Sequence, residues 1–262
     1  MSNQESKTEK TLPIPQEAET TGNKTVLETN ILPLVKTNIM RILLPPELVQ
    51  EINDHIDHGL QEKQDYAENL AGEIKVGEEI KLDPDHADLA GLREAYLESA
   101  EQYLVSYIRN TLTGNLAYEQ NKDGAFSETP EIEIGDMWYN IYYEGDYNPI
   151  HMHRTHSKMG LSSFLFLKVP EHIGVHPTQK DGRPMNDGLT FFNYGDTSGL
   201  DFYDLVCTPS QVSIRPTIGE LWLFPKWLEH GVYPFCGEGE RRTLAANIDI
   251  WFSKPSEEPS EE

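Results

Sequence analysis

The chain has 262 residues and 37% hydrophobic side chains, enough to bury a substantial core in one large β domain with helices or in two small domains. Asp and Glu number 44 against 21 Lys and Arg, so the net charge of −23 argues against binding to nucleic-acid phosphates, and no basic patch offsets it. No apolar window is long enough to span a membrane, the N-terminus lacks the apolar core of a signal peptide, and the two cysteines, Cys207 and Cys236, lack CxxC spacing. We therefore expect a soluble cytoplasmic protein with two buried thiols that binds neither nucleic acid nor a membrane.

The composition of the chain ends predicts one folded domain between two flexible tails. Residues 1–30 contain few large apolar side chains, and residues 253–262 are mostly Pro, Ser and Glu, so neither segment can bury enough surface to offset the entropy of ordering. The predicted domain covers residues 31–252. It has a helical part at about 31–114 and a β-helix core at about 131–252.

Two amphipathic helices are predicted in the helical part. Short apolar runs within residues 31–44 indicate an early strand that leads into a helix. Apolar side chains at intervals of three and four residues then predict helices at 46–60 and 88–112. We expect the polar stretch between them, residues 61–83, to be mobile.

From about residue 131 the hydrophobic period changes to two, which is typical of strands. Gly and Pro separate most of these runs. The predicted strands are 131–134, 138–143, 164–169, 189–192, 212–214, 220–224 and 244–252. This pattern predicts an α+β, mainly β, fold: a sandwich, jelly roll or barrel whose outer sheet face is supported by the two helices.

Three histidines are the candidate metal ligands. His151 and His153 are two residues apart, so on an extended strand their side chains share one face at a separation of about 6.6 Å along the backbone. His230 follows after a long excursion, and an arginine comes shortly after it. That order is the one in which a double-stranded β-helix, the jelly-roll or cupin-like fold, builds a mononuclear non-haem iron site. Three imidazoles on one face leave positions open for a cosubstrate and dioxygen.

The last predicted strand offers a site for an acidic cosubstrate. Arg241, Thr243 and Asn247 alternate onto one face, and Arg242 points to the other. Because arginine matches a carboxylate with two parallel hydrogen bonds, we expect Arg241 to anchor an α-keto acid, which favours iron over zinc or manganese. The alternative is a surface arginine paired with Glu238 or Glu240. Weaker candidates for the pocket walls are Tyr139, Asn140, Tyr142 and Ser163.

Several motifs fall in one order along residues 131 to 252: Trp138-Tyr139-Asn140, Gly145, Asn148-Pro149-Ile150-His151-Met152-His153, Leu161-Ser162-Ser163, Gly219 to Phe224-Pro225, His230, Arg241-Arg242-Thr243 and Asn247. In this order the chain resembles the 2-oxoglutarate and Fe(II)-dependent oxygenases. It is similar in particular to the branch that carries H-x-H followed by a Leu-Ser-Gly segment and is related to prolyl 4-hydroxylases.

The resemblance implies iron on His151 and His230 and 2-oxoglutarate on Arg241 with help from Thr243. His153 holds the second position of the pair, where H-x-D or H-x-E is usual, and either binds iron or only lines the pocket. In the second case, His156 or a water would complete the ligand face. A further departure is Ser163, which stands where a glycine is common.

The remaining histidines have no such pattern. His55 and His58 lie off the apolar stripe of the first predicted helix, so we expect them to be solvated rather than ligands. We expect structural roles for His86, His172 and His176.

The leading functional hypothesis is a 2-oxoglutarate-dependent dioxygenase that hydroxylates an unactivated C–H bond and releases succinate and CO₂. A segment rich in His, Pro, Asp and Gly, residues 171–188, is a candidate lid over the substrate mouth. The resemblance to prolyl hydroxylases favours a protein side chain over a small molecule as the primary substrate. The alternatives are a cupin-like metal- or ligand-binding protein without 2-oxoglutarate turnover, and a non-enzymatic interaction module that binds no metal.

Overall fold

The computed structural model describes residues 28–34, 37–59, 63–107, 130–153, 159–173, 187–194 and 211–251. The predicted tails therefore lie almost wholly outside the described residues, and so do most of the candidate lid, His156, His176 and Cys207.

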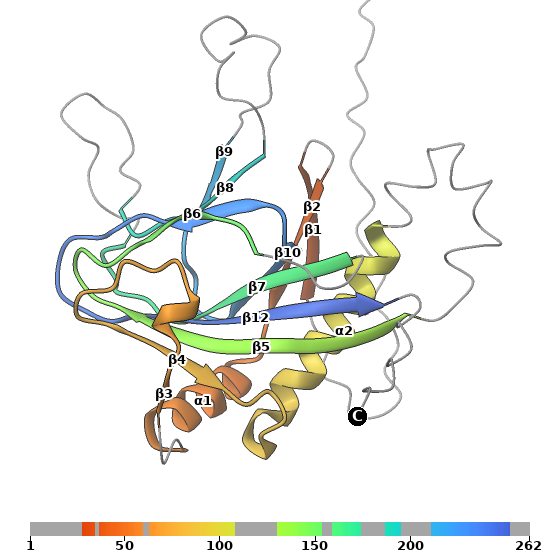
Figure 1. Ribbon diagram of the computed structural model, residues 1–262, viewed down its shortest axis with the longest axis horizontal. Coiled ribbons are helices and arrows are strands. Elements are labelled where there is room, and N and C mark those ends of the chain that lie inside the picture. The colour runs from red at the N-terminus through yellow and green to blue at the C-terminus, as the bar shows by residue number, and fades with distance from the viewer. Residues whose placement is uncertain are drawn as a thin grey trace, which may run out of the picture.

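Two antiparallel sheets form the body of the described chain (Figure 1). The larger sheet has the strand order β1 (Glu28–Leu34), β2 (Thr37–Leu43), β10 (Glu220–Pro225), β7 (Met159–Lys168), β12 (Arg241–Trp251), β5 (Glu131–Tyr142), β4 (Glu78–Leu82) and β3 (Gln64–Asp65). The smaller sheet has the order β6 (Asn148–His151), β11 (Glu229–Val232), β8 (Thr190–Asn193) and β9 (Gln211–Ile214).

The chain crosses repeatedly between these sheets. From β5 to β12 the successive strands lie in the larger, smaller, larger, smaller, smaller, larger, smaller and larger sheet. This alternation is the winding of a double-stranded β-helix, so the predicted mainly β jelly roll is confirmed.

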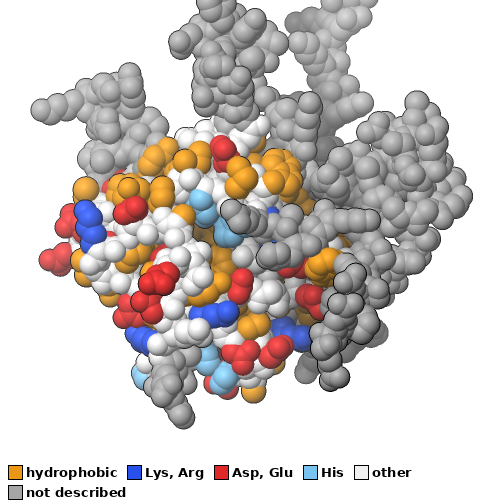
Figure 2. Space-filling view, in the orientation of Figure 1, with side chains coloured by type: hydrophobic (Ala, Val, Ile, Leu, Met, Phe, Trp, Pro, Cys, Tyr) orange, Lys and Arg blue, Asp and Glu red, His pale blue; other side chains and the backbone are white. Residues whose placement is uncertain are grey.

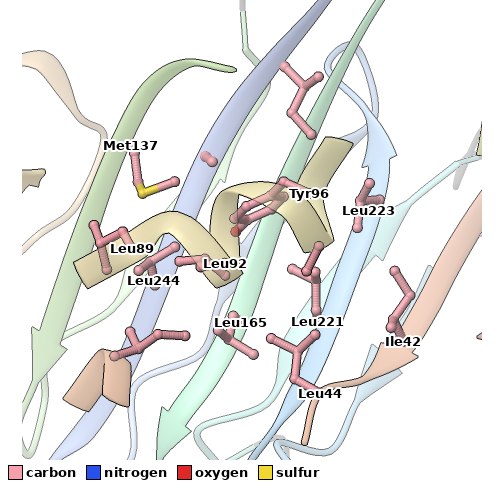
Figure 3. Packing of buried hydrophobic residues seen from close by; sticks show 14 of the residues in the cluster. Ile42, Leu44, Leu89, Leu92, Tyr96, Met137, Leu165, Leu221, Leu223 and Leu244 are labelled. Carbon is pink, nitrogen blue, oxygen red and sulfur yellow. The ribbon is translucent and has the colours of Figure 1, made fainter. Parts of the chain in front are cut away.

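The helical layer covers the face of the larger sheet that lies away from the smaller sheet (Figure 1). It contains α1 (Pro46–Asp54), the π-helix η1 (His55–Gly59), the 3₁₀ turn η3 (Ala87–Leu89) and α2 (Ala90–Tyr107), whereas the 3₁₀ turn η2 (Ala67–Asn69) contacts β4. Figure 3 shows side chains of α2 against side chains of the sheet, among them Leu92 and Tyr96 over Leu165 and Leu221. Burial of each large apolar side chain contributes about 1.5–3 kcal/mol, which fixes the larger sheet against the helices.

A second apolar cluster fills part of the space between the sheets. It is aromatic, with Phe164 and Phe166 of β7, Phe192 of β8 and Phe224 of β10 in mutual contact. Because side chains alternate along a strand, β7 supplies leucines to the helical layer and phenylalanines to the inner space. The unfilled part of this inner space holds the candidate site.

Several sequence predictions need correction. Residues 31–44 lead into a helix, α1, as predicted, but they contain two paired strands, β1 and β2, instead of one, and β1 begins at Glu28, inside the predicted tail. Residues 61–83, predicted to be mobile, contain β3 and β4, and β4 pairs with β5. The sequence did not predict β4 because the strand has only two apolar residues, Ile80 and Leu82, among charged ones. Its buried face is therefore too short to give a clear alternating pattern.

Element boundaries also differ from the predictions. The strands predicted at 131–134 and 138–143 are one strand, β5. The first predicted helix is α-helical only to Asp54 and continues as a π-helix, and the second is described to Tyr107. Cys236 is exposed, so the prediction of a buried thiol is wrong there. No helix in the described part of the chain combines the length and the apolar character needed to cross a membrane.

Candidate active site

Three histidines, two in strands of the smaller sheet and one just beyond the end of β6, meet in the inner space. His151 is the last residue of β6, and antiparallel pairing with β11 places it directly opposite His230. His153 follows two residues beyond His151, and its Nε2 lies 3.2 Å from Nε2 of His230. One ligand atom from each of the three lies within 4.8 Å of the other two. The predicted convergence of these imidazoles is therefore observed.

Backbone carbonyls orient two of the three rings. Nδ1 of His151 lies 2.8 Å from the carbonyl oxygen of Pro149, and Nδ1 of His230 lies 2.9 Å from that of Leu228. A ring that donates its Nδ1–H to a carbonyl keeps the lone pair on Nε2, which is then directed to the common centre.

Burial keeps the three rings neutral. It is the largest cause of the lowered pKa of His151, and burial with the charges of His151 and Lys226 lowers the pKa of His153 to about 3. The pKa of His230 falls well below its ordinary value, again mainly because the ring is buried and then because of its two histidine neighbours. At neutral pH, protons therefore do not compete with a cation for these nitrogens.

His153 has its own supports. Its ring stacks on Trp138 of β5 at 5.9 Å between centroids, and its backbone N–H donates to the carbonyl of Lys226 at 2.8 Å. The ammonium group of Lys226 is in turn buried and pairs with Asp249 at 2.8 Å. His153 is thus held on the ligand face although β6 ends at His151.

Arg241 of β12 is a fully buried guanidinium in the same cavity. Its Nη2 donates to the hydroxyl of Thr190 at 2.9 Å, while Nε and Nη1 have no hydrogen-bond partner in the described part of the chain. The guanidinium carbon lies 5.6 Å from the ring centre of Tyr142 and 5.4 Å from that of Phe166. Burial lowers the pKa of Arg241 to about 10, so the group is a cation at neutral pH. The alternative surface arginine paired with Glu238 or Glu240 is wrong.

The cavity contains about 450 Å³ including its open mouth, and both the histidines and Arg241 line it. The other lining residues are Trp138, Asn140, Tyr142, Asn148, Ser162, Ser163, Phe164, Thr190, Gly231, Val232, Thr243 and Ala245. Figure 2 shows histidine side chains at a hollow near the middle of the view, bordered by hydrophobic side chains.

The predicted cosubstrate residues divide into two groups. Asn140, Tyr142 and Thr243 line the cavity with Arg241, and Nδ2 of Asn140 lies 3.4 Å from the hydroxyl of Thr243. Asn247 does not line the cavity, so its predicted role has no support from the geometry.

Tyr139 and Ser163 do not serve as pocket walls in the predicted way. Tyr139 belongs to the core under the helices, because it points to the other face of β5. Ser163 lines the cavity, but its hydroxyl donates to the carbonyl of Ala246 at 3.0 Å, accepts from the N–H of Ala246 at 3.1 Å and lies 3.1 Å from the hydroxyl of Tyr96. Its hydrogen-bonding capacity is used within the fold.

Thr190 is a site residue that the sequence did not reveal, and Asn148 and Trp138 stood out in it only as members of longer motifs, without a role of their own. Thr190 is the only hydroxyl residue in the apolar strand β8, which is a usable signal for a polar role. Asn148 and Trp138 carry no such signal because their role follows from the crossing of β5 and β6 over the cavity.

Comparison with known proteins agrees with this arrangement. Residues 136–247 match the sequence profile of the family described as "Putative 2OG-Fe(II) oxygenase". No protein of curated function matches the chain significantly.

Solved structures that are similar to the chain include two prolyl hydroxylases and a protein solved with bound 2-oxoglutarate. A Pseudomonas putida prolyl-4-hydroxylase is 17% identical, with 79% of this chain and 88% of that one covered and a TM-score of 0.43. A viral collagen prolyl hydroxylase from Paramecium bursaria Chlorella virus-1, solved with 2-oxoglutarate, is 16% identical, with 81% and 96% covered and a TM-score of 0.42. HygX from Streptomyces hygroscopicus, solved with nickel and 2-oxoglutarate, is 10% identical, with 82% and 83% covered and a TM-score of 0.45.

The matched segment contains all three converging histidines, Arg241 and Thr243. Residues 136–247, less than half of the chain, are therefore similar in sequence to the 2-oxoglutarate and Fe(II)-dependent oxygenases.

Proposed function

We propose that this protein binds one ferrous ion through His151, His153 and His230 and 2-oxoglutarate through Arg241, and that it hydroxylates a C–H bond of a further substrate. The observation that carries the proposal is Arg241: a buried cation, with two unpartnered nitrogens, in the cavity that the three imidazoles line.

The residues present suit a ferrous ion. Three neutral imidazoles on one face are donors that iron, zinc, copper and nickel accept, and they leave the remaining coordination positions to small molecules. The imidazoles alone therefore do not choose the metal. The guanidinium of Arg241 favours iron among these metals, because it suits a keto acid that binds the metal at one end and the arginine at the other.

The surroundings of Arg241 fit a carboxylate. A buried charge without a partner costs several kcal/mol, which a carboxylate that accepts hydrogen bonds from the unpartnered guanidinium nitrogens would offset. Thr190 fixes the third guanidinium nitrogen, and the rings of Tyr142 and Phe166 hold the group in place. The arginine is thus preorganised to receive an anion without moving.

Iron and 2-oxoglutarate, when bound, supply the oxidation: one atom of dioxygen enters succinate as CO₂ leaves, and the other enters a C–H bond of the substrate. The three imidazoles hold the ion without releasing protons. Arg241 orients the far carboxylate, and Thr243 and Asn140 lie beside it as polar groups of the wall. Phe164 and the neighbouring aromatic cluster exclude water from the inner end.

Turnover of 2-oxoglutarate tests the proposal. The purified chain, supplied with Fe(II), ascorbate and dioxygen, is expected to convert 2-oxoglutarate to succinate slowly without a primary substrate. His151→Ala and Arg241→Met are expected to reduce this rate at least about 100-fold. The matched controls, His58→Ala and Arg215→Met at exposed positions, are expected to retain it.

The rival function is a cupin-like metal- or ligand-binding protein. It predicts stoichiometric metal binding that depends on His151 and His230 but no succinate under any of these conditions. That outcome, in a chain that binds iron, would overturn the proposed activity and keep the metal site.

We also propose a cytoplasmic location, which the composition supports. The exposed thiol of Cys236 is free, as is usual in a reducing compartment.

A further inference from the structure

A second group of metal-ligating side chains lies in the helical layer, away from the cavity. His55, His86 and Asp88 each offer one ligand atom within 4.8 Å of the other two. His55 is the first residue of η1, which continues α1, and the other two lie at the start of η3, which leads into α2. We propose that these three residues form a separate binding site for a divalent transition metal ion such as Zn²⁺, and that the ion joins the end of α1 to the start of α2.

The separations suit a bound ion. Oδ2 of Asp88 lies 3.2 Å from Nδ1 of His55 and 3.7 Å from Nδ1 of His86. Two ligand atoms of a tetrahedral zinc site are about 3.3 Å apart, as bond lengths of about 2.0–2.1 Å require. The two imidazole rings lie 4.5 Å apart between centroids. Two nitrogens and one oxygen are a common donor set for zinc, which takes a water as its fourth ligand.

The burial pattern distinguishes this group from a chance cluster of exposed polar side chains. Only 2% of the His55 side chain is exposed, whereas 44% of His86 and 60% of Asp88 are. An imidazole placed under two solvent-accessible ligands forms a site that an ion and its water can enter from outside. Figure 2 shows further histidine side chains at the lower edge of the molecule, the region where Figure 1 places the helical layer.

The local backbone is arranged around His55. A π-helical turn begins at this residue, and such turns are rare and occur frequently at functional sites. The prediction that His55 is solvated is therefore wrong, whereas the exposed His58 in the same turn agrees with it. His58 is thus a matched control from the same element.

The simpler reading is a hydrogen-bonded cluster without an ion. In that reading Asp88 accepts from His55, and Nδ1 of His86 caps the helix start by accepting from the N–H of Asp88 at 3.2 Å. The capping nitrogen, Nδ1 of His86, is the one that lies 3.7 Å from Asp88, so an ion bound there would take the place of the cap. The two readings differ in one measurable property, which is the number of ions bound per chain.

Zinc titration calorimetry on the full chain, freed of metal with a chelator, tests the site. To separate it from the cavity, the titration uses the double variant His151→Ala/His230→Ala as its starting protein. We expect this protein to bind one Zn²⁺ per chain, and His86→Ala or Asp88→Asn added to it to bind none. Adding His58→Ala instead is expected to leave the stoichiometry at one.

Circular dichroism of each variant verifies folding, and the exposed positions of His86 and Asp88 make folding expected. A rise in the thermal midpoint on adding Zn²⁺ should be present in the starting protein and absent from the Asp88→Asn variant. The proposal is overturned if the starting protein binds no zinc, or if folded His86→Ala and Asp88→Asn variants bind as much as it does. Neither result bears on the iron site, which the starting protein lacks.

Discussion

Arg241 and Arg242 are neighbours in β12 and are both buried, but they lie on opposite faces of the larger sheet. Arg242 faces the helical layer, and each of its three nitrogens has a partner: Nε donates to Glu240 at 2.5 Å, Nη1 to Asn53 at 3.1 Å and Nη2 to Asp57 at 2.7 Å. Arg241 faces the cavity, and only one of its three nitrogens has a partner in the described part of the chain.

The difference teaches how to separate a structural charge from a binding charge. A saturated buried ion pair contributes to the fold, and removal of one member leaves the others uncompensated. An unsaturated buried cation costs the fold stability and is retained where a ligand completes its hydrogen bonds. The same substitution at the two positions should therefore have opposite consequences.

The largest effect is expected for the binding of 2-oxoglutarate to Arg241→Met. Loss of two charge-assisted hydrogen bonds, each about 1.5–3 kcal/mol, raises the KM for 2-oxoglutarate by about 100-fold or more. The free energy of unfolding should stay the same or rise, because methionine replaces an unpaired buried charge at similar volume. Steady-state kinetics and urea denaturation measure the two quantities. A loss of stability with an unchanged KM would reverse the assignment of the two arginines.

Arg242→Met should destabilise the protein by about 3 kcal/mol, because Asp57, Glu240 and the buried side chain of Asn53 lose their donor. Although burial opposes it, hydrogen bonds from Arg242 and Lys168 lower the pKa of Asp57 in the folded state. Urea denaturation measures the stability, and the KM of the folded fraction should be unchanged. A stable variant with a raised KM would show that Arg242, too, serves the ligand.

Glu79 extends the comparison of the two arginines to a buried acid whose carboxyl oxygens lack hydrogen-bond partners among the described residues. It pairs across β4 and β5 with the cavity residue Asn140, and neither carboxyl oxygen has a hydrogen-bond partner among the described residues. Burial, with the nearby charges of Asp65 and Asp146, raises its pKa to about 7.

A raised folded-state pKa means that stability is present in full below the unfolded-state value and is lost as the pH rises through about 7. Glu79→Gln should therefore match the wild type near pH 4.5 and be more stable by roughly 2–3 kcal/mol at pH 8. Thermal unfolding of both proteins across this range measures the difference. A constant difference at all pH values would show that the carboxyl does not titrate in this window.

The smallest effect is expected for Ser163→Ala. The hydroxyl links β7 to β12 through Ala246 and contacts Tyr96, so its loss should cost about 1 kcal/mol of stability. The KM for 2-oxoglutarate should not change, since the hydroxyl does not serve the cavity. Urea midpoints and kinetics of the variant together decide between a structural and a binding role.

The site was more predictable from the sequence than its surroundings were. The H-x-H pair, the distant histidine and the arginine strand follow a period of two, and strand geometry alone determines which side chains share a face. For this reason His151, His230 and Arg241 could be placed before the fold was known. Asn247 follows the same alternation but does not line the cavity. The two-residue period of a strand determines which face of the sheet a side chain is on, but not how far along the strand the cavity extends.

What could not be predicted depends on which elements become neighbours. Thr190 partners Arg241 only because β8 crosses the inner face of the larger sheet. β4 was not predicted because only two of its five residues are apolar, so its alternating pattern is weak. The strand forms because it pairs with β5, which is a tertiary contact that the local sequence does not indicate. His55 is buried through a π-helical turn that the apolar stripe of an α-helix does not foresee.

The most direct test of the central claim is the visible absorption of the anaerobic protein with Fe(II) as 2-oxoglutarate is added. A metal-to-ligand charge-transfer band that saturates at one 2-oxoglutarate per chain is predicted for the wild type and for Arg215→Met, and Arg241→Met should require about 100-fold more cosubstrate. Absence of the band in a protein that binds iron, or an unchanged titration for Arg241→Met, would contradict the proposed site.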